Sequence, residues 1–142
     1  VHLMGHRPEH LDLARELGFD SAWTRDILPG LAWDGVVDAS NAAELPGLAV
    51  QLVEPGRRVV YIGLAVTPSR IDTRDLVLKD VTAVGILGAS AGLAGTISAY
   101  ADGSVDPRPL VAATVGLDEV AAVLAGHRPP GTGPKLHVDP KE

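Results

Sequence analysis

Three residues at the end of a short apolar run combine types that could bind an anion. Gly5, His6 and Arg7 directly follow Val1–Met4, which has the composition of a strand. In a parallel sheet an acidic residue at such a strand end binds ribose hydroxyls. A small residue with an arginine close behind instead leaves room for a 2′-phosphate and neutralises its charge. Taken alone the pattern is weak, because an arginine near a strand end is usually solvated.

The same stretch contains the pattern H-x-x-E-H, which is found in one class of zinc proteases. That chemistry needs both histidines one turn apart inside a helix, with the glutamate as the base. Here Pro8 lies between the two histidines, and His6 precedes the position where a helix can start. We therefore favour a strand-to-helix turn with surface histidines over a metal site.

A second motif, GASAG at Gly88–Gly92, matches the nucleophile elbow G-x-S-x-G and would make Ser90 the nucleophile of a serine hydrolase. Asp118 and His127 follow it in the order that such enzymes use. The stretch after Ser90 is short for an acid strand and a histidine loop, and no glycine cluster for an oxyanion hole precedes it. The alternative is a Gly/Ala-rich turn between a strand and a helix, whose small residues allow another group to approach the backbone closely. Neither G-x-G-x-x-G nor a P-loop is present.

Apolar runs typical of strands alternate along the chain with segments spaced like helices. The expected strands are Val1–Met4, Ser21–Trp23, Gly35–Ala39, Arg58–Gly63, Thr82–Leu87, Ala113–Val115 and Lys135–Val138. The expected helices are Pro8–Gly18, Ala42–Val53, Leu93–Ala101 and Leu117–Ala125, with loops over 26–34, 64–75 and 128–134. The run at 58–63 is continuously apolar after Arg58, as in strands that are covered on both faces. This alternation predicts an α/β protein with a parallel sheet.

Composition and charge exclude several classes of protein. The chain has 142 residues, of which 46% are hydrophobic, and 12 basic against 18 acidic residues give a net charge of −6. With no basic cluster, general nucleic-acid binding is not expected. The absence of cysteine excludes disulfides, thiolate catalysis and cysteine-bound zinc in this chain. No membrane span or signal peptide is visible, so we expect a cytoplasmic location. The strand-like run that begins at Val1 suggests a piece of a longer protein.

Six stretches carry a family resemblance, in this order: GHRPEHLDLARELGFD, WDGVVDASN, LVEPGRRVVYIGL, DLVLKDVTAVGILGAS, ISAYADGSVDPRPLVAATVGLDEVAAVLAG and PKLHVDP. Together they span essentially the whole chain, which resembles the C-terminal half of a medium-chain dehydrogenase/reductase of the zinc-type alcohol dehydrogenase-like family. The resemblance implies an incomplete Rossmann-type doubly wound sheet at 1–104, without its first strand and glycine-rich turn. It implies a return segment at 105–142 that packs on an absent GroES-like catalytic domain.

The resemblance also implies a nicotinamide cofactor and the residues that bind it. Gly5 occupies the place of the acid that selects NAD, so that Gly5, Arg7 and an assisting His6 favour NADP over NAD. The other implied cofactor-binding residues follow later strands: Ser40, Asn41, Gly63, Leu64, Ala65, Leu87, Gly88, Ala89 and Lys135. Asn41 departs from the Thr-Gly that many relatives have at this place.

The chemistry implied by the resemblance is hydride transfer between nicotinamide and an alcohol or carbonyl, or an activated alkene. No catalytic residue and no metal ligand of the family falls within this chain, so its zinc dependence stays open. A small-molecule substrate and a homodimer through the edge strand Thr82–Leu87 are further implications. The alternatives are a non-catalytic nucleotide-binding or interaction module, and the hydrolase built on Ser90. We expect the isolated chain to be inactive and unstable, because the missing strand is central in the order 3-2-1-4-5-6.

Overall fold

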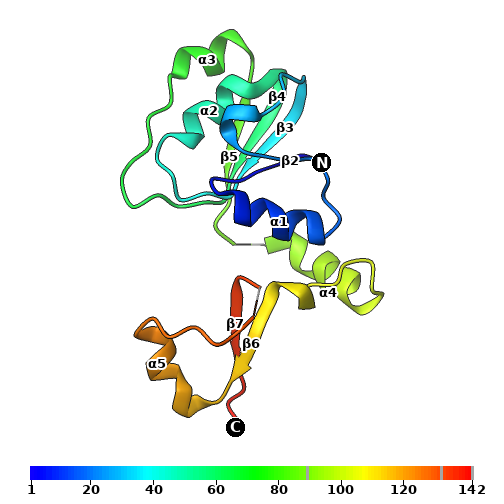
Figure 1. Cartoon of the computed structure of the whole chain (residues 1–142). Helices are drawn as coiled ribbons and strands as arrows, with labels where there is room; N and C mark the ends of the chain where they lie inside the picture. The colour runs from blue at the N-terminus through cyan, green and yellow to red at the C-terminus, as the bar shows by residue number, and fades with distance from the viewer. Residues whose placement is uncertain (89, 132, 142) are drawn as a thin grey trace. The chain divides into compact units, whose positions relative to one another are not determined.

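The computed structural model describes residues 1–88, 90–131 and 133–141, in which strands and helices alternate (Figure 1). Two compact units are formed, one by Val1–Pro29 with Ala94–Glu142 and the other by Gly30–Leu93. The strands are β1 (Leu3–Met4), β2 (Ala22–Trp23), β3 (Trp33–Asp38), β4 (Val53–Tyr61), β5 (Thr82–Gly85), β6 (Val111–Val115) and β7 (Lys135–Val138). The α-helices are α1 (Pro8–Glu16), α2 (Leu45–Leu52), α3 (Thr73–Leu78), α4 (Leu93–Ala101) and α5 (Val120–Leu124).

The unit formed by residues 30–93 is built on a parallel three-stranded sheet in the order β3-β4-β5. Helices α2 and α3 lie along this sheet (Figure 1). The core of this unit is a small aliphatic cluster. It is formed by two residues near the end of α2 and two valines of β4. The buried members are Ala49, Val50, Val53 and Val59. Leu76 of α3 packs against the same cluster, so both helices cover one face of the sheet.

The opposite face of this sheet carries a row of valines. Val37, Val60 and Val84 occupy one register row across the three strands and share a side, because directly paired residues point to the same face. Val60 and Val84 are half-buried, and helices α2 and α3 of the same unit pack on the other side. Coverage of both faces therefore stays a prediction.

Several element boundaries differ from the sequence-based expectation, and three of them shape the unit of residues 30–93. Helix α3 begins at Thr73, inside the expected loop, because the Asp72 carboxylate accepts a hydrogen bond from the Arg74 amide and caps the helix. Strand β5 ends at Gly85 instead of continuing to Leu87. Strand β4 already starts at Val53, directly after α2, and its pairing with β3 is irregular before Arg58.

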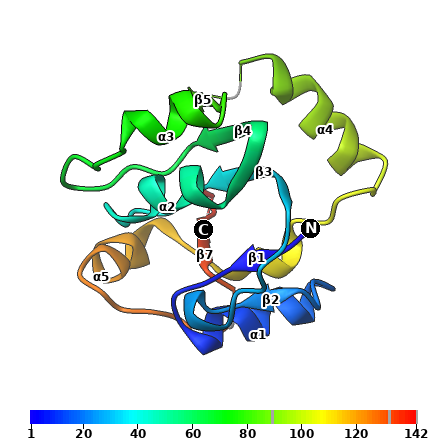
Figure 2. The ribbon, with the colours of Figure 1, turned by 90° about the horizontal axis from the view of Figure 1, so that it is seen from above.

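The first residues of the other unit form a strand–helix–strand element. Strands β1 and β2 pair in parallel, and α1 packs beside them through Leu11 and Ala14 (Figure 2). The helix ends before Gly18, whose φ of 87° is unfavourable for other residues. The Phe19 amide then donates to the carbonyl oxygen of Ala14 at 2.9 Å, which completes the expected glycine stop.

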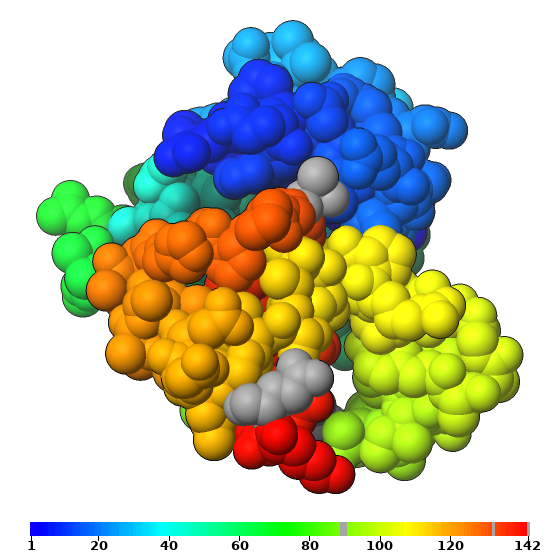
Figure 3. Space-filling view, turned by 60° about the horizontal axis from the view of Figure 1, so that its bottom comes forward, coloured from blue at the N-terminus to red at the C-terminus, as the bar shows by residue number. Residues whose placement is uncertain are grey.

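The C-terminal segment contributes the parallel pair β6-β7 and the short helix α5. Residues of this segment, coloured orange, form part of the molecular surface in Figure 3. Leu117 and Leu124 are both more than half exposed. Close to β6, a Cβ atom on Gly133 would overlap the backbone of Leu110, so the loop before β7 lies directly against the strand.

The parallel strands form three separate sheets among the described residues. Strand β1 pairs only with β2, and β3 pairs only with β4. The predicted fold class, an incomplete Rossmann-type sheet without its first strand, is confirmed. None of the helices described is long and apolar enough to cross a membrane.

Candidate functional site

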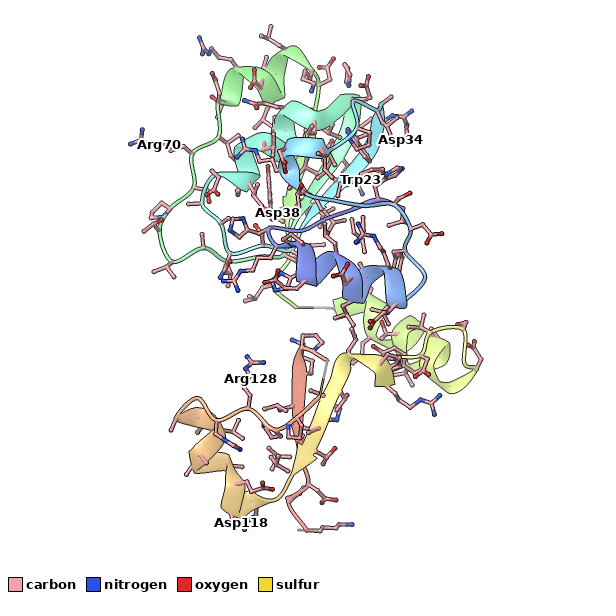
Figure 4. The ribbon with its side chains drawn as sticks, viewed as in Figure 1. Trp23, Asp34, Asp38, Arg70, Asp118 and Arg128 are labelled. Carbon is pink, nitrogen blue, oxygen red and sulfur yellow. The ribbon has the colours of Figure 1, made fainter. Side chains whose placement is uncertain are left out.

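The carboxyl edge of the β3–β4 pair is organised around Asp38, the last residue of β3. Its side chain is buried, and Oδ1 accepts a hydrogen bond from the Ser40 amide at 2.9 Å. Its main-chain oxygen accepts two more, from the amides of Ile62 at 2.9 Å and Gly63 at 3.0 Å. Asp38 lies where the strands of this sheet end, whereas Asp34 lies at the opposite end of β3 (Figure 4). One residue therefore ties together the loops that follow two neighbouring strands.

Gly63 and Ser40 are two of the predicted site residues, and the structure brings them into direct backbone contact. A Cβ atom built on Gly63 would overlap the carbonyl oxygen of Ser40 and press on its nitrogen and carbonyl carbon. The Ser40 hydroxyl accepts from the amide of Ala42 at 3.4 Å, so it helps to shape its own loop. Asn41 follows on the exposed side of this loop. Only glycine permits this approach at position 63.

The predicted residues after Gly63 and after β5 lie at the same edge of the sheet. Leu64 is 74% exposed and Ala65 is half-buried. The Ile86 amide donates to the carbonyl oxygen of Tyr61 at 2.9 Å, which carries the pairing with β4 one residue beyond β5. Leu87 and Gly88 follow and are exposed. Ala89, also predicted here, lies outside the described residues.

Tyr61, which sequence reasoning missed, supports this edge from the covered face. Its hydroxyl donates to the carbonyl oxygen of Pro46 at 3.0 Å and so connects β4 to the first turn of α2. Burial, with the charge of the Asp38 carboxylate, raises the pKa of Tyr61 above its ordinary value of 10.0. Asp38 was missed as well, although an acid that ends the apolar run of GVVDAS is a visible signal.

The predicted phosphate-selecting residues occupy the carboxyl end of β1. The Gly5 amide donates to the Trp23 carbonyl oxygen at 3.0 Å, and a Cβ atom at Gly5 would lie 2.9 Å from Cδ2 of Leu11. A residue as small as glycine thus lets α1 pack close to the strand end. Arg7 occupies the N-cap position of α1 without a side-chain capping bond and is exposed, with Nη1 3.8 Å from Oε1 of Glu9.

The same edge carries a second cation that was not predicted. Arg25 directly follows Thr24, at the carboxyl end of β2, and is exposed. His6 is also exposed beside Arg7. Lys135, the remaining predicted residue, is the exposed first residue of β7, where it pairs with Val111.

The predicted residues therefore fall into two sets. Ser40 and Gly63 lie together in the unit of residues 30–93, and the predicted positions 64, 65, 87 and 88 end strands of the same sheet. Gly5–Arg7 and Lys135 belong to the other unit. Each set is formed by elements of its own unit.

The two alternative chemistries gain no support from the described side chains. His6 precedes α1 while His10 lies within it, and the described residues contain no cluster of three or more side chains that could hold a metal ion. A resident zinc therefore does not fit the residues that the structure describes. The Ser90 side chain, on which the hydrolase hypothesis depends, lies outside the described residues. That hypothesis stays testable by fluorophosphonate labelling that Ser90→Ala should abolish.

Comparison with known proteins places this geometry in a known fold. No protein-family profile matches the sequence, and no curated protein matches it. Solved structures do match. A protein from Sinorhizobium meliloti 1021 that is described as a zinc-binding dehydrogenase, bound to NADP, superposes with a TM-score of 0.83 at 19% identity. The match covers 99% of this chain and 45% of that one.

Two further structures show the same similarity. The 2R,3R-butanediol dehydrogenase of Bacillus subtilis has a TM-score of 0.79 at 19% identity, over 96% of this chain and 42% of its own. A short chain alcohol dehydrogenase from Escherichia coli CFT073, complexed with NADH, has a TM-score of 0.76 at 22% identity, over 86% and 39%. The chain thus spans less than half the length of these proteins. The fold implied by the sequence resemblance, which is shared with part of these dehydrogenase structures, is confirmed.

Proposed function

We propose that this chain provides the cofactor-binding part of an NADP-dependent oxidoreductase. The observation that carries the proposal is the backbone contact between Gly63 and Ser40 at the carboxyl edge of a parallel sheet. Ligands of doubly wound sheets bind at this edge. Glycine at position 63 lets the loops after β3 and β4 meet there, so that the main chain of both loops forms this edge. The likeness of the fold to structures that contain NADP or NADH supports the same conclusion.

The proposed preference for NADP rests on the end of β1. Gly5 presents no side chain that would repel or exclude a 2′-phosphate, and the exposed Arg7 guanidinium can donate two hydrogen bonds to it. Glu9, 3.8 Å from Arg7 Nη1, competes only weakly, because both groups are solvated. The residues present therefore fit a phosphorylated ribose at this strand end.

The proposed reaction is hydride transfer between the cofactor and an alcohol or carbonyl, or an activated alkene. When bound, the nicotinamide ring supplies the hydride chemistry, and the protein supplies binding and orientation. In this chain Gly63, Leu64 and Ala65 would line the ribose next to the nicotinamide. Ser40, which touches Gly63, would lie beside the adenosine half. The exposed main chain of Leu87 and Gly88 would meet the carboxamide. The substrate is proposed to be a small molecule.

A homodimer through β5 is part of the proposal. Among the described residues β5 pairs on one side only, with β4, and Thr82 and Ala83 are exposed. A strand edge of this kind can add a strand from a second copy. Light scattering on the full natural polypeptide should give a dimer, and Ala83→Pro should shift it toward monomer.

The cofactor proposal is tested by titrating the full natural polypeptide with NADPH and NADH and following cofactor fluorescence. Arg7→Ala should weaken NADPH about tenfold, equivalent to about 1.4 kcal/mol, and leave NADH unchanged. Arg15→Ala is the matched control, because Arg15 lies on the same helix and pairs with Asp12. Equal affinity of the unmodified protein for both cofactors would remove the NADP assignment. Binding of neither would remove the proposed function, and binding without turnover of any alcohol or carbonyl would favour a non-catalytic module.

A further inference from the structure

Asp38 collects three amide donors from two different loops. The Ser40 amide comes from the loop after β3 and bonds to the carboxylate, whereas the Ile62 and Gly63 amides come from the end of β4 and bond to the main-chain oxygen. All three amides belong to the loops that follow β3 and β4, where the cofactor is proposed to bind. The position of Ser40 against Gly63 is thereby set from both sides by a single residue.

The burial of this acid is costly, and its hydrogen bond explains why it is tolerated. Asp38 is 8% exposed. Among the residues that the structure describes, it is the only charged one that is buried. An ionised carboxylate removed from water is unfavourable unless hydrogen bonds replace its hydration. The Ser40 amide at 2.9 Å does so in part. Asp34 shows the contrast, since it lies on the same strand but is exposed and pairs with Arg57 at 2.9 Å.

The bonding pattern also determines what this edge offers to a ligand. Phosphate groups bind where free main-chain amides converge. Here the amides of Ser40, Ile62 and Gly63 are already donating to Asp38. These three amides are therefore not available to a phosphate, whereas the Ser40 hydroxyl and the exposed Asn41 side chain can bond to a ligand hydroxyl.

We propose that Asp38 is the positioning residue of this site: it holds Ser40 against Gly63 and keeps the edge an acceptor surface for a ribose instead of an anion site. The proposal rests on the proposed function, because the ribose is that of the cofactor. Asp38 acts through Ser40 and Gly63 and does not itself contact the ligand. Its effect is therefore expected on the ribose over Gly63 and not on a 2′-phosphate at the end of β1, which belongs to the other unit.

The test compares two ligands on the full natural polypeptide: NADPH, which spans both halves, and adenosine 2′,5′-bisphosphate, which lacks the nicotinamide half. Asp38→Ala should weaken NADPH about fivefold to tenfold and change the affinity for the bisphosphate by less than twofold. Asp38→Asn, whose amide oxygen can still accept from Ser40, should restore NADPH binding to within about twofold. Asp34→Ala is the control on the same strand and should change neither affinity.

Each other outcome has a defined meaning. Equal losses for both ligands in Asp38→Ala would show a general structural role and overturn the proposal, as would unchanged NADPH binding. Failure of Asp38→Asn to restore binding would also overturn it. If the unmodified protein binds neither ligand, the proposed function itself fails, and the role of Asp38 fails with it.

A second measurement uses the unmodified protein, so that the proposal can be tested even if Asp38→Ala does not fold. Amide hydrogen exchange should show Ser40, Ile62 and Gly63 protected before any ligand is added, relative to Val66 in the following exposed loop. NADPH should leave that protection unchanged. Free exchange of the three amides without ligand, or protection that appears only with NADPH, would overturn the proposal, because the ligand instead of Asp38 would then hold these donors.

Discussion

Gly63 and Ser40 touch through their main chains, so closely that a single methyl group on Gly63 would overlap the Ser40 carbonyl. The contact joins the loops after two neighbouring parallel strands, β3 and β4. It follows directly from the hydrogen bonds by which the Ser40 and Gly63 amides both reach Asp38.

Gly63→Ala should therefore damage both stability and cofactor binding. The added methyl group must push the Ser40 loop away, and overpacking of this kind costs about 1–3 kcal/mol in the free energy of unfolding. Urea unfolding of the full natural polypeptide measures the loss. Gly95→Ala is the control, because a Cβ atom there meets no neighbour and alanine is the better helix residue. Equal stability of Gly63→Ala and the unmodified protein would disprove the contact.

Lys79 stabilises the end of α2 from the loop after α3. Its Nζ donates to the carbonyl oxygens of Val50 at 3.1 Å and Gln51 at 2.9 Å, which lie in the last turn of that helix. A cation at a helix C-terminus is also favoured by the helix dipole. We expect Lys79→Ala to lower the free energy of unfolding by about 1–2 kcal/mol. Lys79→Met should lose as much, and full stability of the methionine variant would show that only the aliphatic stem matters.

Asp72 and Asp106 should stay ionised in unusually acidic solution. A hydrogen bond from the neighbouring arginine, Arg74 or Arg108, lowers the pKa of each carboxyl from 3.8 to about 2. Because the folded-state pKa is the lower one, the stabilisation is complete above pH 3.8 and is lost as the pH falls through about 2. Carbon-13 NMR titration should give midpoints near 2 for both groups. In Arg74→Ala the Asp72 midpoint should return toward 3.8, and an unchanged midpoint would refute the assignment.

The isolated 142-residue chain should be unstable, aggregated or folded with a rearranged sheet. Strands β1 and β3 each have one paired neighbour among the described residues, and Val37 of β3 is largely exposed. Unpaired main-chain groups that become buried cost about 1–3 kcal/mol each, against a total stability of about 5–15 kcal/mol. Calorimetry and amide NMR should show no sharp cooperative transition and poor dispersion. A sharp melt with a dispersed spectrum would contradict this expectation.

The sequence by itself determined the order and type of most elements. The β-branched run at Arg58–Gly63 predicted a strand, which the structure forms over Val53–Tyr61, and Gly18 ends α1 because its backbone conformation excludes most other residues. Local residue preferences are sufficient for such features. The missing first strand, by contrast, was an implication of the family resemblance.

The tertiary structure alone decided which residues meet. Nothing in the spacing of Ser40 and Gly63 shows that their backbones touch, because contact between loops depends on strand register. The role of Asp38 arises in the same way, from hydrogen bonds between segments more than twenty residues apart. The side on which α2 and α3 pack is likewise decided by the tertiary structure, because an apolar run does not show which face of a strand a helix covers.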